Sequence, residues 1–150
     1  MAEFEYQNVE AWNTAIKLTT AVGRLRVGSN LKASADAQTE AFKQAGLAAA
    51  LIAEGAGREG GAQVQLYRDA RGSLAQCRSW LHILASLMNE QETVFGNEFD
   101  LAEQCARQVT GTLRAMERGP SQAPNVMPQR PPVRGPGPGG PRNQGAGGPR

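Results

Sequence analysis

Proline is missing from the first 119 residues of this chain, although the 150 residues include nine prolines. Because proline removes a hydrogen-bond donor and clashes with the preceding turn inside a helix, its absence over such a length favours a bundle of helices. The chain also lacks a run of eighteen apolar residues and any N-terminal stretch resembling a secretory signal. We therefore expect neither a membrane span nor export, and the predicted location is the cytoplasm.

Residues suited to catalysis or metal binding are equally scarce, with one histidine and two cysteines. Cys77 and Cys105 lack CxxC spacing, so we expect structural thiols in a reducing compartment. His82 has no HExxH partner, and the glycine-rich residues 55–61 lack the GxxxxGK(S/T) signature of a phosphate loop. We expect a protein that is not an enzyme and has no metal, no cofactor and no small-molecule substrate.

Proline and glycine instead gather in residues 119–150, which contain nine prolines and eight glycines. Such a segment buries too little apolar surface to offset its ordering entropy, so the sequence predicts a disordered tail after a domain at residues 1–118. Charge changes at the same boundary, because residues 1–118 have a net charge of −2 (12 − 14) and the tail has no acid. The basic residues of the tail are Arg130, Arg134, Arg142 and Arg150. They suit either a weak contact with a polyanion or a plain solubilising role.

Residues 64–88 have the clearest periodicity in the chain. Apolar and small residues recur there at alternating intervals of three and four, which keeps one face of a helix against its neighbours. The members of this seam are Tyr67, Ala70, Leu74, Cys77, Leu81, Leu84 and Met88. A helix of about 25 residues would be nearly 40 Å long and would need partners along its whole length.

Three further segments supply those partners. A first helix is predicted from residues 4–8 to about residue 25, a second over about 34–54, and a last one over about 98–118. The expected inner faces are Val9, Trp12, Ile16 and Val22 in the first helix, Phe42, Ala45, Ala49 and Ile52 in the second, and Phe99, Ala102, Ala106, Val109, Leu113 and Met116 in the last. Four helices with short loops predict an all-α, up-down-up-down antiparallel four-helix bundle.

The second helix is rich in alanine, which lets backbones approach closely, so we expect it to be the inner, tightly packed helix. Ser34 and Asp36 are candidate N-caps. The helix is expected to end at residues 55–57, where a glycine in the left-handed conformation would cap it. Glu54 opposes the helix dipole there, so we expect Arg58 or a group on a neighbouring helix or subunit to compensate. A structural hydrogen-bond acceptor is favoured over a functional acid at Glu54.

Three arginines stand on the central segment. Arg68 and Arg71 are close enough to share a helix face, and Arg78 stands further along the same segment. Asp69 interrupts the basic run. A solvated helix face is the default interpretation, and a stripe that binds nucleic acid or a protein partner is the alternative.

Two sets of residues resemble a known family. Ile52-Ala53-Glu54-Gly55, followed by Gly57-Arg58 and Gly72-Ser73-Leu74, is similar to the four-helix-bundle proteins encoded in intervening sequences of 23S ribosomal RNA genes. The second set resembles the accessory variability determinant, Avd, of diversity-generating retroelements, which shares that fold. It consists of Leu66-Tyr67, Asp69, Leu74, Arg78, Trp80-Leu81 and Leu84-Ala85. The resemblance covers about residues 6–118, with Val9, Ala11 and Trp12 matching the first helix, and Arg78 with Trp80 is nearer to Avd.

The resemblance implies a non-enzymatic bundle that assembles as a homo-oligomeric ring, a pentamer, with a basic surface for RNA and a reverse transcriptase. The expected binding residues are Lys43, Arg58, Arg68, Arg71, Arg78, Arg130, Arg134, Arg142 and Arg150. The expected structural residues are Trp12, Glu54, Gly55, Tyr67, Leu74, Trp80 and Leu81. The alternative is a structural or protein-interaction oligomer of the intervening-sequence type with no nucleic-acid role.

Overall fold

The structure is a computed structural model that describes residues 4–28, 32–90 and 92–118. Within those residues the chain forms four α-helices: α1 (Glu10–Gly23), α2 (Lys32–Ala56), α3 (Gly60–Leu87) and α4 (Gly96–Glu117). Two short 3-10 helices, η1 (Glu5–Asn8) and η2 (Glu92–Phe95), precede α1 and α4. The predicted disordered tail at 119–150 lies outside the described residues.

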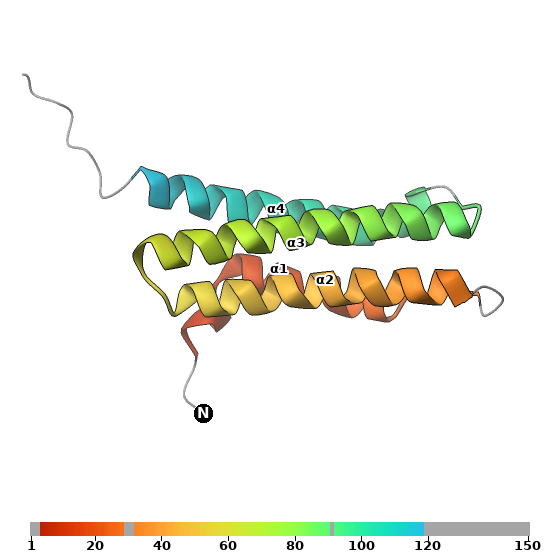
Figure 1. Cartoon of the computed structure of the whole chain (residues 1–150), viewed down its shortest axis with the longest axis horizontal. Coiled ribbons are helices and arrows are strands. Elements are labelled where there is room, and N and C mark those ends of the chain that lie inside the picture. Colours follow the sequence, from red (N-terminus) through yellow and green to blue (C-terminus); the bar gives the residue numbers. More distant parts are fainter. Residues whose placement is uncertain (1–3, 29–31, 91, 119–150) are drawn as a thin grey trace, which may run out of the picture. The chain divides into compact units, whose positions relative to one another are not determined.

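The four helices run antiparallel to their neighbours in chain order, which confirms the predicted up-down-up-down bundle (Figure 1). Each helix contacts the next one in the chain, and α4 closes the bundle against α1. The contact between α2 and α3 is the most extensive. None of the described helices is long and apolar enough to cross a membrane.

The predicted seam of α3 forms the centre of the core. Tyr67, Ala70, Leu74, Cys77, Leu81 and Leu84 are all buried, and Met88, just past the end of the helix, is half-buried. The alanine-rich face of α2 packs against them, with its alanines and Ile52 almost fully enclosed. This confirms the tight packing predicted for α2, although Phe42 and Leu47 on its other face are exposed. Leu84 also joins a smaller core cluster with Ala37, Ala85 and Phe95.

The predicted inner face of the first helix is partly wrong. Ile16 is 40% exposed, whereas the small residues Ala11 and Ala15 are buried together with Leu18 and Val22. The buried set has spacings of four, three and four, so it also satisfies the helical period. At Ala11 the inner face lies close to α4, because Cys105 Sγ is 3.3 Å from the Ala11 carbonyl oxygen.

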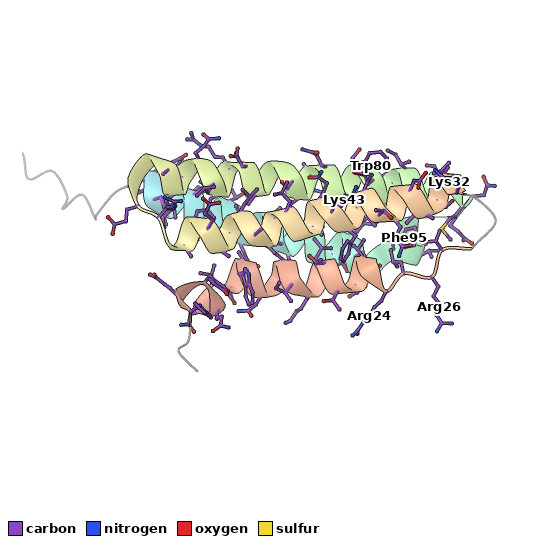
Figure 2. All side chains as sticks on the ribbon, turned by 60° about the horizontal axis from the view of Figure 1, so that its bottom comes forward. Arg24, Arg26, Lys32, Lys43, Trp80 and Phe95 are labelled. Carbon is purple, nitrogen blue, oxygen red and sulfur yellow. The ribbon has the colours of Figure 1, made fainter. Side chains whose placement is uncertain are left out.

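Phe42 is the second correction, because it was predicted to face the core and is 45% exposed. Its ring lies over α1 at Gly23, where an added Cβ would stand only 3.0 Å from Phe42 Cε2. Phe42 therefore covers the α1–α2 boundary instead of filling the interior. Figure 2 shows Arg24 and Arg26, just past the end of α1, extending away from the bundle.

The predicted helix ends need correction at two places. Ser34 was a candidate N-cap, but α2 begins at Lys32, so Ser34 and Asp36 both lie inside the helix. Gly55 was predicted at the capping turn, but it is a helical residue, and the glycine with a positive φ is Gly60, at 62°. The last carbonyls of α1 and α2 accept hydrogen bonds from the backbone amides that follow each helix, and a side chain adds to this at the end of α1. Gln38 Nε2 donates to the carbonyls of Val22 (3.0 Å) and Leu25 (2.7 Å).

A short segment connects α3 to α4. It begins with Asn89, which has a φ of 54° and follows the C-cap of α3. The amides of Asn89 and Glu90 donate to the carbonyls of Ser86 and Ala85, which is the hydrogen-bond pattern of a glycine-type helix stop. Phe95 then turns inward and is 3% exposed, so this connection contributes to the core.

Candidate nucleic-acid interface

A groove of about 410 Å³ runs between α3 and α4 and is rich in arginine. Arg78 lines it from α3, and Arg107 and Arg114 line it from α4. Glu103, Ala106, Thr110 and Gly111 complete its wall. The small residues keep the groove open, since a Cβ on Gly111 would meet nothing within 4 Å.

Heptad spacing on both helices extends this basic surface. Arg71 and Arg78 are seven residues apart on α3, and Arg107 and Arg114 are seven apart on α4, so each pair shares a helix face. We refer to these four residues as the α3–α4 arginine stripe. All four are exposed. Neither Arg107 nor Arg114 was among the predicted binding residues, although their spacing repeats that of Arg71 and Arg78.

Three of the four charges in the stripe have no acidic partner. Arg71, Arg78 and Arg114 form no ion pair with any described residue, whereas Arg107 Nη1 lies 2.7 Å from Glu103 Oε1. That pair is well exposed, so it holds Arg107 only weakly. An exposed guanidinium group without an acidic partner can bind phosphate oxygens through two parallel hydrogen bonds. A groove with several such groups suits a phosphate backbone.

The other predicted binding residues lie in ion pairs elsewhere on the bundle. Arg68 Nη2 is 3.1 Å from Glu117 Oε1. This ion pair links α3 to the C-terminal end of α4. Arg58 Nη2 is 3.2 Å from Glu54 Oε1, so Arg58, one of the two predicted alternatives, is the partner of Glu54. Lys43, labelled in Figure 2, is 3.3 Å from Glu40 on the outer side of α2. The tail residues Arg130, Arg134, Arg142 and Arg150 lie outside the described residues.

Apart from Glu54, which is exposed in its ion pair with Arg58, the residues predicted to be structural are in or against the core. Tyr67, Leu74 and Leu81 are buried, and Trp12 and Trp80 are half-buried against it. The ring of Trp12 packs on Tyr6, with centroids 5.1 Å apart. Trp80 contacts both core clusters, so it joins the middle of α3 to the end of the bundle where Phe95 lies.

Burial also governs the chemistry of the core side chains. It raises the pKa of the Cys77 and Cys105 thiols to about 12, and in Cys105 the neighbouring Cys77 adds to the effect. Cys105 Sγ donates a hydrogen bond to the carbonyl of Ala11 (3.3 Å). Burial likewise raises the pKa of Tyr67, with a smaller contribution from Glu5. The thiols therefore stay protonated near neutral pH, and protonated thiols are poor nucleophiles and poor metal ligands.

His82 is exposed, and the centroid of its ring lies 4.6 Å from the centroid of the Phe99 ring. Across the described ranges, no three His, Cys, Asp or Glu side chains come together in a way that could hold a metal ion. Of the predicted binding residues, the arginine groove contains Arg78, which it brings together with the unpredicted Arg107 and Arg114. No protein-family model, no curated protein and no solved structure matches the chain.

Proposed function

We propose that this chain is a non-enzymatic accessory module that binds RNA through the α3–α4 arginine stripe. The observation that carries the proposal is the gathering of Arg78, Arg107 and Arg114 around one groove. Arginine binds phosphate by charge and by bidentate geometry, and an elongated basic groove can follow a nucleic-acid backbone. The slightly acidic balance of residues 1–118 makes this local concentration of positive charge a distinct feature of the surface.

The family resemblance supplies the biological setting of the proposal. An Avd-like protein would act in the cytoplasm as a homopentameric ring and would present RNA to a reverse transcriptase during retroelement mutagenesis. In a ring, copies of the stripe from several subunits would act on one RNA. Multivalent contact would then raise the affinity well above that of a single stripe.

Salt dependence of RNA binding is the direct test. Fluorescence anisotropy with a labelled RNA hairpin, measured between 50 and 200 mM salt, should give a plot of log K against log salt with a slope of about −3 for each engaged stripe of four arginines. The double variant Arg78→Gln/Arg114→Gln should make the slope shallower by about 1.5 per stripe. The matched control is Lys43→Gln/Arg58→Gln, which removes two paired charges and should leave the slope unchanged. Equal effects of the two double variants, or salt-independent binding, would contradict the proposal.

A structural or protein-interaction oligomer without a nucleic-acid role is the second candidate, and one observation favours it. Ile16 and Phe42 are 40% and 45% exposed, although both are large apolar side chains. They come from neighbouring helices, and the intervening positions Thr19, Gly23 and Gly46 carry no charge. A surface that exposes large apolar side chains with uncharged residues between them is typical of contacts between subunits.

Assembly is tested by light scattering on the full chain. Five 15.9 kDa chains would give a particle of about 80 kDa. Phe42→Glu should reduce that mass, whereas Leu47→Glu, on an apolar residue of α2 that is similarly exposed at 46%, is the matched control. A monomer of the unmodified chain would contradict both candidate functions. A ring that binds no RNA would leave only the second candidate.

A further inference from the structure

The α3–α4 arginine stripe consists of two rows, one on each helix. Arg71 and Arg78 form the row on α3, and Arg107 and Arg114 form the row on α4. The members of each row are seven residues apart, which places them about 10 Å from each other along the helix axis. The two helices lie side by side and antiparallel (Figure 1). Because the axes of packed helices are about 8–10 Å apart, the four arginines are attached at the corners of a rectangle with sides of about 10 Å.

The ion pair between Arg68 and Glu117 fixes how the two rows stand relative to each other. In antiparallel helices, the residue three positions later on α3 lies opposite the residue three positions earlier on α4. Arg71 therefore lies at the level of Arg114. Seven positions further along, the other two arginines of the stripe also lie opposite each other, and both line the groove. Each cation of one row thus has a counterpart in the other row.

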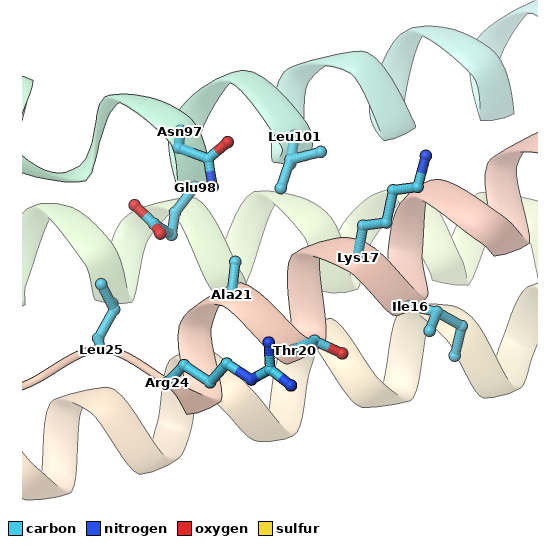
Figure 3. Close-up of a pocket in the computed structure, with 9 residues that line it drawn as sticks. All are labelled: Ile16, Lys17, Thr20, Ala21, Arg24, Leu25, Asn97, Glu98 and Leu101. Atoms are coloured by element: carbon cyan, nitrogen blue, oxygen red, sulfur yellow. The ribbon is translucent and has the colours of Figure 1, made fainter.

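A second pair of cations on the bundle has no such opposite row. Lys17 and Arg24 are seven residues apart on α1, both are exposed, and neither forms an ion pair with a described residue. They line a cavity of about 590 Å³ between α1 and the first turns of α4 (Figure 3). To that cavity α4 contributes Asn97, Glu98 and Leu101, and none of these is a cation. A phosphate chain on that side of the bundle meets cations from one helix only.

The lining of the arginine groove suits a phosphate backbone better than unpaired bases. Among the described residues that line it, none is aromatic, whereas proteins that bind single strands usually stack the bases on aromatic rings. Its neutral lining residues, Ala106, Thr110 and Gly111, are small, so a bulky duplex can approach the arginines. Contacts of this kind read charge and shape and carry no base sequence.

Two facing rows of cations fit two facing rows of phosphates. The major groove of A-form RNA is deep and narrow, so the phosphates of its two strands face each other across it. In B-form DNA the grooves are about 12 Å and about 6 Å wide, and neither width matches rows that are about 8–10 Å apart. We propose that the arginine stripe binds double-stranded RNA across its major groove, with the α3 row on one strand and the α4 row on the other. The inference rests on the proposed function, because it names the form of RNA that the same site binds.

Fluorescence anisotropy with the full chain tests the inference. The probes are an RNA duplex of about 20 base pairs, a DNA duplex of the same sequence, and one RNA strand alone, all at the same salt concentration. The RNA duplex should bind at least about tenfold more tightly than the other two, because it alone engages both rows. An RNA duplex of unrelated sequence should bind equally well.

The outcomes separate the inference from the proposed function. If the DNA duplex or the single strand binds as tightly as the RNA duplex, the inference is wrong, and RNA binding by the stripe still stands. If the two RNA duplexes differ in affinity by tenfold or more, bases are being read and the inference is also wrong. Absence of binding to every probe would contradict the proposed function and the inference together.

Variants of each row then assign the strands. Arg71→Gln/Arg78→Gln removes the α3 row, and Arg107→Gln/Arg114→Gln removes the α4 row. All four residues are exposed, so both variants should fold. Each should lower the affinity for the RNA duplex by at least about tenfold, to that of the single strand, because one strand of the duplex loses its contacts. Preference for the RNA duplex that persists in both row variants would overturn the inference.

The matched control is Lys17→Gln/Arg24→Gln. It removes two exposed cations that have the same spacing and no acidic partner, but from the side of the bundle without an opposite row. The control should keep the preference for the RNA duplex. If it loses that preference as completely as the row variants do, net charge and not the two facing rows governs binding, and the inference fails.

Discussion

Gly55 of α2 lies directly under the ring of Tyr67 of α3, so closely that a Cβ on residue 55 would stand 3.1 Å from Tyr67 Cε2. The ring has little room to move away, because Tyr67 is 2% exposed. The structural role predicted for both residues therefore has one physical cause, which is the close approach of α2 and α3. The glycine is needed for space, since the turn conformation occurs at Gly60.

Gly55→Ala should therefore destabilise the bundle. Alanine gains about 1 kcal/mol over glycine inside a helix, but overpacking of a tight core costs about 1–3 kcal/mol, so the expected net loss is about 1 kcal/mol. Gly72→Ala is the matched control, because Gly72 is also helical and an added Cβ there would meet nothing within 4 Å. That variant should gain about 0.5–1 kcal/mol. Urea denaturation measures both, and equal stabilisation by the two changes would contradict the close packing.

Ala49→Leu tests the inner position of α2. Ala49 is 5% exposed and belongs to the main core, so three extra carbon atoms should cost about 1–3 kcal/mol. Its neighbour Ala50 is exposed on the same helix. Ala50→Leu should change the free energy of unfolding by less than about 0.5 kcal/mol. The two variants are compared by thermal and urea unfolding, and similar values for both would place Ala49 outside the core.

Ser34→Ala should stabilise the protein. Ser34 is 1% exposed, and its hydroxyl oxygen has no hydrogen-bond partner in the part of the chain that is described. Removing an unsatisfied buried hydroxyl and improving helix propensity should together raise the free energy of unfolding by about 1 kcal/mol. Ser73→Ala is the control, because Ser73 Oγ donates to the carbonyl of Asp69 at 3.2 Å. Its substitution should give a smaller gain or a loss, and a loss at Ser34 would show that its hydroxyl is satisfied in solution.

Stability should fall at alkaline pH because of the buried thiols. Burial raises the pKa of Cys77 and Cys105 from 9.0 to about 12, so the folded state keeps protons that the unfolded state releases. The stabilisation is complete below pH 9 and is lost as the pH rises from about 9 to about 12, on the order of 1 kcal/mol per pH unit for each thiol.

The double variant Cys77→Ala/Cys105→Ala provides the control for this alkaline loss. It should be less stable at neutral pH, because it leaves cavities, but its free energy of unfolding should fall less steeply above pH 9. Chemical denaturation at a series of pH values measures both slopes. Rapid modification of either thiol by a maleimide in the native protein at pH 8 would show that the side chains are accessible and would contradict the raised pKa.

The helices and the seam of α3 were predictable because helical periodicity is a local property. Tyr67, Leu74 and Leu81 recur at intervals that only a helix can place on one face, and the absence of proline up to residue 119 kept every segment free to be helical. The ion pair between Glu54 and Arg58 was predictable for the same reason, because four residues separate them in one stretch of chain. The inner faces of α1 and α2 were harder to predict. The large apolar residues Ile16 and Phe42 were expected in the core, but small residues take that place.

Relations between helices required the three-dimensional structure. Spacing placed Arg68 and Arg71 on one face of a helix, but only the packing of α4 against α3 brought Arg107 and Arg114 beside Arg78 and paired Arg68 with Glu117. In the same way, Glu98 is an ordinary first-turn acid in the sequence, but in the fold it is only 8% exposed. Sequence alone therefore determined which segments are helical and most of the central seam, because those depend on neighbours within one or two turns. The tertiary structure decided which charges are paired, gathered or buried, because that depends on distances between helices that no spacing along the chain contains.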